Sequence, residues 1–208
     1  MRTARQYLHR PGCPRLAMAT AVALLLSFGA IAEEGDVGSV TDLKGQAFAQ
    51  SSAARRSLEP QAAIMLGDHV ETGDKSLATL LLGRRTTLRL GARGSIVIDK
   101  FLVEAGGEIT LQSGPLMVEH TEGGPAESMQ IHTDYGLIAV RGTRVFVGPE
   151  GKALAVFVER GEVSVQAGGR SVTLHAGEGT AIASPGAKPA RVARWKQKRI
   201  DALFASIR

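Results

Sequence analysis

The sequence predicts an all-β fold, organised as a short-strand β-solenoid or as a β-roll or sandwich, with one C-terminal amphipathic helix. Short segments in which apolar and polar residues alternate recur at regular intervals, as half-buried strands require. Glycine, proline and acidic residues separate these segments and leave no room for crossover helices. A stripe of apolar residues with helical spacing follows residue 190 and predicts the helix.

One pattern, glycine-x-apolar-x-apolar, occurs four times, starting at Gly94, Gly107, Gly114 and Gly161. Glycine turns the backbone at little steric cost, and the next residues alternate between the two faces of a strand. We therefore expect each copy to begin a strand after a tight turn. The copies are irregularly spaced, so the solenoid and the two-sheet roll both stay open at this point.

The expected strands follow one another along an all-β domain over 33–183. A strand pair is predicted at 37–50, and a polar hinge at 51–61 separates it from the rest. The later strands are predicted at 67–72, 76–83, 86–91, 95–99, 107–112, 115–120, 128–133, 136–140, 143–147, 153–159, 162–167, 170–175 and 179–183. Residues 184–189 contain two prolines and form the predicted linker to the helix.

The first 32 residues have the composition of a secretory signal peptide. Four arginines precede an apolar run, and small residues follow it up to Ala32. We expect cleavage after Ala32 and a periplasmic or secreted mature protein that begins at Glu33. The apolar run is short for a bilayer span, which favours a signal peptide, and an uncleaved membrane anchor is the alternative. No later segment is apolar enough to cross a membrane.

Removal of the leader nearly neutralises the chain. The whole sequence has 25 Lys and Arg against 20 Asp and Glu; without the four leader arginines, 21 remain against 20. This balance removes the main support for nucleic acid as a partner. The only cysteine, Cys13, lies in the leader, so disulfides and thiolate chemistry are excluded from the mature protein.

The segment 190–208 is the predicted helix. It carries six basic residues and one acidic residue, beside a body over 33–189 with 15 basic and 19 acidic residues. We expect its apolar stripe either to pack on the β domain or to dock on a membrane or a partner, and charge complementarity favours the domain. The stripe consists of Val192, Trp195, Ile200, Leu203, Phe204 and Ile207.

Residues that carry out catalysis or hold cofactors are not recognisable in the sequence. The histidines at 69, 120, 132 and 175 are too far apart for a metal motif, and His132 with Asp134 is the one pair worth noting. No G-x-S-x-G elbow and no phosphate loop occurs. We therefore expect no enzyme activity, no metal and no cofactor.

From about residue 70 to residue 182 the sequence resembles the FecR-type periplasmic domain family. The resemblance rests on VETGDKSLATLLLGRRTTLRLGARGSIVI, EITLQSGPLMVEH, MQIHTDYGLIAVRGTRVFV and LAVFVERGEVSVQAGGRSVTLHAGEG, in that order. The positions that match its motifs are Thr72, Gly73, Arg141, Gly142, Thr143, Gly161, Gly177 and Glu178.

We expect the matching positions to serve the fold more than a binding site. We expect Gly142 to adopt a backbone conformation denied to other residues, and Thr143 to cap the turn or to start the next strand. Arg141 is expected to pair with an acid on a neighbouring strand, and contact with a partner is the alternative.

The resemblance implies an exported β scaffold. The best-known relatives pass a signal from an outer-membrane receptor to a sigma factor, but the segments that flank the domain here are too short for the additional modules of that role. We therefore expect a protein-interaction or signalling scaffold that contacts an unknown envelope protein. A module that binds envelope polysaccharide or peptidoglycan is the alternative, and a sigma-factor regulator of the iron-uptake type ranks below both.

Overall fold

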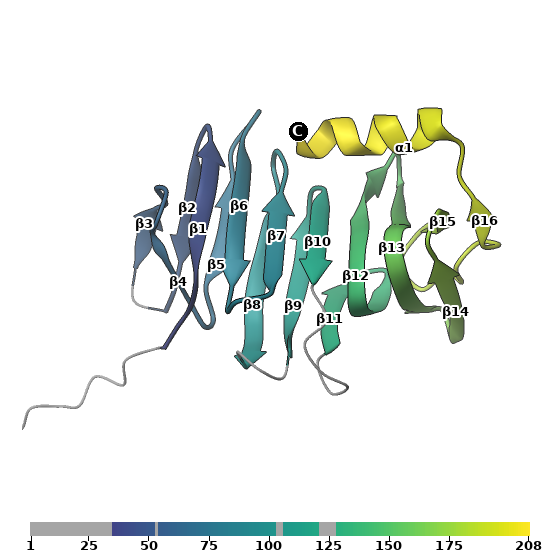
Figure 1. Cartoon of the computed structure of the whole chain (residues 1–208), viewed down its shortest axis with the longest axis horizontal. Helices are drawn as coiled ribbons and strands as arrows, with labels where there is room; N and C mark the ends of the chain where they lie inside the picture. Colours follow the sequence, from purple (N-terminus) through teal and green to yellow (C-terminus); the bar gives the residue numbers. More distant parts are fainter. Residues whose placement is uncertain (1–34, 53, 103–105, 121–127) are drawn as a thin grey trace, which may run out of the picture. The chain divides into compact units, whose positions relative to one another are not determined.

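The computed structural model describes residues 35–52, 54–102, 106–120 and 128–208. The predicted signal peptide and its cleavage site lie outside these residues. The described part is predominantly β-sheet with one short C-terminal helix, as the sequence predicts (Figure 1). Its strands are β1 (Asp36–Lys44), β2 (Ala47–Gln50), β3 (Arg55–Ser57), β4 (Ala63–Met65), β5 (His69–Thr72), β6 (Leu77–Leu82), β7 (Thr86–Leu90), β8 (Ser95–Leu102), β9 (Gly106–Ser113), β10 (Leu116–His120), β11 (Ser128–Thr133), β12 (Gly136–Glu150), β13 (Ala153–Ala167), β14 (Arg170–His175), β15 (Glu178–Ile182) and β16 (Ala193–Arg194).

Hydrogen bonds join these strands into one curled sheet with two halves. One half has the order β3-β2-β5-β8-β9-β11 and the other has the order β4-β1-β6-β7-β10. Every strand pair in the described residues is antiparallel except β9 with β11. The solenoid alternative is not confirmed, because a β-solenoid is built from parallel neighbours.

The long hairpin of β12 and β13 connects the two halves. The first part of β12 pairs with β11 up to Val140, whereas its second part pairs with β10 from Arg144 onward. The register between β12 and β13 shifts between Arg141 and Arg144. The sequence predicts two short strands in each arm of the hairpin, whereas the structure has one long, bent strand in each arm. A bend of this kind lets one strand belong to both halves.

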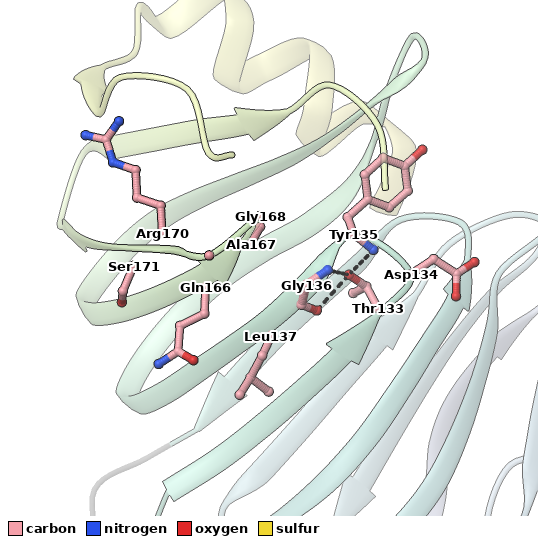
Figure 2. Close-up of a pocket in the computed structure, with 11 residues that line it drawn as sticks. Thr133, Asp134, Tyr135, Gly136, Leu137, Gln166, Ala167, Gly168, Arg170 and Ser171 are labelled. Atoms are coloured by element: carbon pink, nitrogen blue, oxygen red, sulfur yellow. Dashed lines mark hydrogen bonds between the residues drawn. The ribbon is translucent and has the colours of Figure 1, made fainter. Parts of the chain in front are cut away.

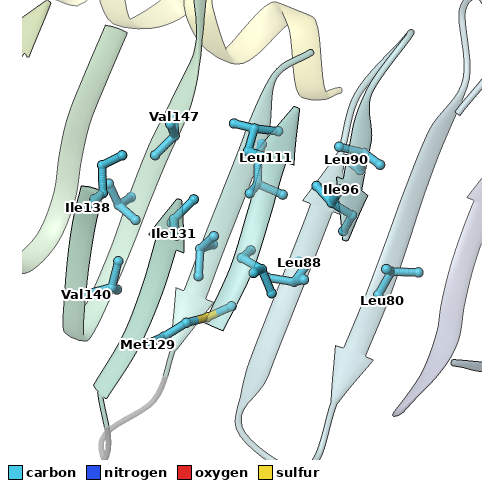
Figure 3. Packing of buried hydrophobic residues seen from close by; sticks show 14 of the residues in the cluster. Leu80, Leu88, Leu90, Ile96, Leu111, Met129, Ile131, Ile138, Val140 and Val147 are labelled. Atoms are coloured by element: carbon cyan, nitrogen blue, oxygen red, sulfur yellow. The ribbon is translucent and has the colours of Figure 1, made fainter. Parts of the chain in front are cut away.

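One apolar core lies between the two halves (Figure 3). Side chains alternate along each strand, so that every second residue enters the core. Leu80 and Leu88 enter it from β6 and β7, and Ile96 and Leu111 enter it from β8 and β9. All four are at most 4% exposed, which makes this layer the main source of stability.

Two sequence-based expectations need correction. The polar hinge at 51–61 contains strand β3, and its Leu58 is buried in the core. Gly94 and Gly114 precede strands as expected, but Gly107 and Gly161 lie inside β9 and β13. Within a strand, glycine marks a close backbone approach or a bend, and this second use cannot be separated from a turn by pattern alone.

An ion pair between Arg56 and the buried Asp68 carboxylate holds residues 51–61 against the sheet. The Arg56 guanidinium binds both carboxylate oxygens of Asp68, with 2.9 Å between Nη1 and Oδ1, and donates to the carbonyl of Ala63. Asp68 is fully buried and also accepts the backbone N–H of Met65. The hydrogen bond to Asp68, followed by its charge, raises the pKa of Arg56 despite the opposing effect of burial.

The C-terminal helix is shorter than the sequence predicts. Helix α1 (Gln197–Phe204) continues as the 3-10 turn η1 (Ala205–Ile207). The preceding residues are extended instead of helical, because Ala193 and Arg194 pair with Gly179 and Glu178 of β15 as strand β16. No helix within the described residues is long and apolar enough to span a membrane.

The helix packs against the outer face of the sheet. Leu203 and Ile207 are buried there, and Trp195, Ile200 and Phe204 pack beside them. The sheet side of this contact, which we name the outer cluster, consists of Leu77, Met117, Phe146, Ala155 and Phe157. The predicted stripe therefore docks on the β domain, with one difference: Val192 packs against the main core.

Candidate functional site

Four turns between strands lie close together and border two hollows, and we name these turns the turn cluster. The turns join β9 to β10 at Gly114, β11 to β12 at Tyr135, β12 to β13 at Lys152 and β13 to β14 at Gly169. The β12–β13 turn reaches Tyr135 because the hairpin of β12 and β13 bends in its middle. The β13–β14 turn lies beside Tyr135 because Leu137 pairs with Gln166. Turns carried by a rigid sheet are common positions for binding residues.

Tyr135 stands between the two hollows, in a turn that Thr133 stabilises. The Thr133 hydroxyl accepts the N–H groups of Tyr135 and Gly136, each at 3.1 Å, and donates to the Gly136 carbonyl (Figure 2). The Tyr135 hydroxyl donates to the carbonyl of Lys152 at 3.2 Å. These bonds fix the ring between the β11–β12 turn and the β12–β13 turn.

The larger hollow has a volume of about 680 Å³ and is open to solvent. Two turns form its walls, one around Asp134 and Tyr135 and the other from Gln166 to Ser171 (Figure 2). Arg170 and Asp134 supply opposite charges, and Gln166 and Ser171 supply neutral hydrogen-bonding groups. This hollow therefore suits a polar ligand or a segment of another chain.

The smaller hollow, of about 220 Å³, lies on the other side of Tyr135. Gln112 and Ser113 of β9 border it, together with Lys152 and Leu154. Among the described residues that line the two hollows, Asp134 is the one carboxylate and no histidine occurs. The described residues contain no group of three His, Cys, Asp or Glu side chains that could hold a metal ion.

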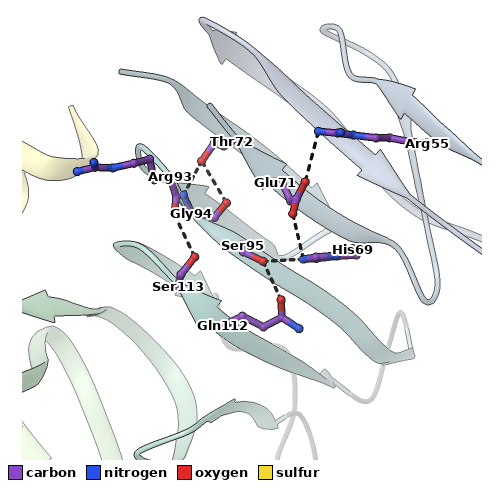
Figure 4. A network of polar contacts seen from close by, with 9 residues as sticks. All are labelled: Arg55, His69, Glu71, Thr72, Arg93, Gly94, Ser95, Gln112 and Ser113. Atoms are coloured by element: carbon purple, nitrogen blue, oxygen red, sulfur yellow. Dashed lines mark hydrogen bonds and ion pairs between the residues drawn. The ribbon is translucent and has the colours of Figure 1, made fainter. Parts of the chain in front are cut away.

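A polar network crosses the outer face of β5, β8 and β9 and has the composition of a catalytic triad (Figure 4). His69 Nε2 lies 2.6 Å from Ser95 Oγ and 3.8 Å from the Glu71 carboxylate. Both contacts use the same ring nitrogen, whereas a triad needs the acid on the other nitrogen. Ser95 also donates to Gln112, so this network links β5, β8 and β9 without the geometry of a triad.

The structure separates His132 and Asp134, the one pair noted in the sequence. His132 Nε2 lies 4.0 Å from the carboxylate of Glu108 on β9. Asp134 occupies the exposed turn beside Tyr135. Within the described residues, the two side chains belong to no metal-binding group.

The family-motif residues fall into three places. Thr72 and Gly73 end β5, where the Thr72 hydroxyl donates to Gly91 and accepts the N–H of Gly94 at 2.8 Å. Gly73 donates its N–H to Gln46. These contacts link the end of β5 to two neighbouring loops, as a structural role requires.

The second place is the bend of the long hairpin. Gly142 has φ +58°, as expected, and Gly161 has φ +87° on the opposite strand. Thr143 is fully buried, and its hydroxyl has no hydrogen-bond partner among the described residues, so it continues the strand and does not cap a turn. Arg141 is exposed, and the ion pairs of the described residues do not include it.

The third place is the turn from β14 to β15. Gly177 donates its N–H to Val158 and accepts that of Trp195. The Glu178 carboxylate accepts the N–H of His175 at 2.9 Å. The motif residues therefore hold the fold at separate points, and the turn cluster is built from others. The sequence analysis did not identify Tyr135, Gln166 and Arg170 as candidate site residues. One signal singles out Tyr135: the sequence has only two tyrosines.

Comparisons with known proteins agree with this fold. Residues 68–164 match the family described as FecR protein. The match begins two residues before the predicted resemblance and ends within its last block, which starts at Leu154. No curated protein sequence gives a significant match to this chain.

Two crystal structures, at 2.50 and 1.65 Å resolution, of a candidate anti-sigma factor from Parabacteroides distasonis share the fold. Each gives a TM-score of 0.56 at 13% identity and covers 65% of this chain. The similarity spans 63 or 64% of those chains, less than two thirds of their length, and concerns the fold alone. The sequence similarity to the FecR family therefore covers residues 68–164 of this chain, from β5 into β13.

Proposed function

We propose that the chain is a non-catalytic interaction module that takes part in signalling in the cell envelope. The observation that carries this proposal is the FecR match over residues 68–164, which includes the bend and the Tyr135 turn. The contact of His69 with both Ser95 and Glu71 through one nitrogen supports the absence of catalysis. The leader composition supports export.

Two other functions stay as alternatives. Regulation of a sigma factor is favoured by the description of the Parabacteroides protein as a candidate anti-sigma factor. Binding of envelope polysaccharide or peptidoglycan is favoured by the hollow beside Tyr135, where an aromatic ring lies among Gln166, Arg170 and Ser171.

The signalling proposal is tested by comparing the transcripts of a deletion strain with those of the same strain carrying the wild-type gene. We expect a discrete set of genes to change and to recover on complementation. Unchanged transcripts under envelope stress would contradict the proposal. A change confined to the targets of one sigma factor would favour the sigma-regulating alternative.

Interaction and export need separate measurements. A photo-crosslinking amino acid at Tyr135 should give an adduct with one envelope protein, and the same label at Arg84, on the β6–β7 turn, is the matched control. Co-sedimentation with purified peptidoglycan, without any protein adduct, would favour the polymer-binding alternative.

The intact mass of the exported protein should correspond to a chain that begins at Glu33, and retention of residues 1–32 would refute the signal peptide.

A further inference from the structure

The sheet leaves one long edge open, at β14. Among the described strands, β3, β4, β14 and β16 each have a single neighbour, and β14 is the longest of them with six residues. The chain protects the nearby edge of β15 with its own strand β16 and with the bond from the Ala190 N–H to Ala181. Proteins commonly cover or shorten edges, so an uncovered strand of this length is a candidate docking edge.

The direction of the β14 backbone groups follows from the hairpin. Gly168 and Gly169, both with positive φ, form a two-residue turn, so the flanking residues Ala167 and Arg170 are a hydrogen-bonded pair. Alternation then turns the N–H and C=O groups of Ser171 and Thr173 away from β13. His175 is in phase with them, and its N–H indeed leaves β13 to meet Glu178.

The side chains of β14 define what a neighbouring strand would meet. Leu174 is buried in the core and Val172 packs against it, whereas Ser171 and Thr173 are exposed. A strand added here would therefore place apolar residues beside Val172 and polar residues on the other face. Arg170 and Ser171 also line the larger hollow of the turn cluster, which lies at one end of this edge.

Positive charge lies at the Arg170 end of the edge. Arg170 begins β14, and the Lys188 backbone packs against the turn at Gly168. At the other end, the Arg194 guanidinium lies 3.8 Å from where a Cβ on Gly177 would be. Two carboxylates offset the charge of Arg194 there, since Glu162 lies 3.4 Å from His175 and Glu178 accepts the His175 N–H. An acidic ligand is therefore favoured at the Arg170 end of the edge.

We propose that β14 binds an extended, acidic segment of a partner protein by strand addition, with a carboxylate placed near Arg170. This inference rests on the proposed interaction function and names its surface. A second copy of the chain is a poorer occupant, because β14 carries no acidic residue that antiparallel pairing could place beside Arg170.

The test uses two synthetic peptides of alternating valine and threonine, one preceded by two glutamates and the other by two lysines. Amide exchange and chemical shifts of the protein are measured with each peptide. We expect the acidic peptide to protect the Ser171 and Thr173 amides and to bind about tenfold more tightly than the basic one. No protection of these amides by either peptide overturns the proposal.

Two variants at one position separate backbone pairing from side-chain effects. Thr173→Pro removes an outward N–H without removing a hydrogen bond to β13. It should weaken binding of the acidic peptide by roughly tenfold or more. Thr173→Val keeps that N–H and should bind as the wild type does. Equal affinity of both variants overturns strand addition. Arg170→Glu should remove the preference for the acidic peptide, and an unchanged preference overturns the placement of the carboxylate.

Further outcomes distinguish failure of the β14 proposal from failure of the proposed interaction and signalling function. If protection of the Ser171 and Thr173 amides grows with protein concentration in the absence of peptide, two β14 strands pair with each other. That result overturns the proposal that an acidic partner segment occupies this edge. A cellular partner crosslinked equally by the wild type and by Thr173→Pro overturns the β14 edge but leaves the interaction function standing. Peptide binding without any transcript change contradicts the signalling function alone.

Discussion

Gly161 lies directly against Gly142 at the bend of the long hairpin. A Cβ at position 161 would stand 2.5 Å from the carbonyl oxygen of Gly142 and 2.5 Å from the Thr143 methyl group. Both glycines have positive φ. The two strands therefore turn from one half of the sheet into the other at a point where both backbones are left-handed and a side chain at position 161 would clash.

We expect Gly161→Ala to destabilise the domain by about 2 kcal/mol, because it adds left-handed strain to a steric clash. Gly151→Ala is the matched control, since Gly151 also has positive φ, +62°, but nothing lies within 4 Å of its Cβ position. Chemical denaturation measures both. Equal losses would show that the close approach at the bend contributes nothing.

Gly142→Val should lower the melting temperature of the domain. A β-branched residue at φ +58° costs roughly 1–3 kcal/mol of backbone strain, a large part of the stability of a typical domain. Thermal unfolding followed by far-UV circular dichroism checks this. An unchanged melting temperature would contradict the conformation of Gly142.

A chain that ends at Arg194 should lose thermal stability and aggregate. It keeps β16 but exposes the outer cluster, in which Phe146 and Phe157 pack against Phe204 with ring centroids 6.2 and 6.0 Å apart. Light scattering and calorimetry measure the effect, with Lys198→Ala on the exposed helix face as the control. A truncated chain that melts as before and stays monomeric would show that the helix does not support the body.

The contact of Arg199 with Glu150 should contribute modestly to docking. The Arg199 Nε donates to Glu150 at 2.8 Å, and the guanidinium lies 3.5 Å above the Trp195 ring. Both side chains of the pair are about one third exposed, so a double-mutant cycle with alanine should give at most about 1 kcal/mol. The fluorescence of Trp195, the only tryptophan, reports the local change. A coupling energy of zero would assign docking to the apolar contacts alone.

The neighbouring arginines of β3 give a matched comparison of ion pairs. Asp68→Asn leaves Arg56 without its buried partner and should cost about 3 kcal/mol. Glu71→Gln removes the exposed partner of Arg55 and should cost less than about 1 kcal/mol. Urea denaturation compares the two variants, and similar losses would contradict the assigned importance of the Asp68 pair.

Local patterns determine much of this protein. Alternation of apolar residues predicts nearly every strand, because the side-chain period of a strand is visible within five residues. The stripe with Leu203 and Ile207 predicts docking for a similar reason, since helical spacing is local and an apolar face needs cover. The motif at Gly142 likewise predicts a special backbone conformation from residue type alone.

Tertiary structure decides the arrangement of these parts. Whether Gly161 begins a strand or bends one depends on Gly142 across the hairpin, and no local pattern contains that approach. The length of the helix depends on β15, which pairs with Ala193 and Arg194 and holds them extended. Tyr135 and Arg170 border one hollow only because the start of β12 pairs with the end of β13, with Leu137 opposite Gln166. Strand patterns are set by neighbours in sequence, whereas sites and open edges are set by which strands meet in space.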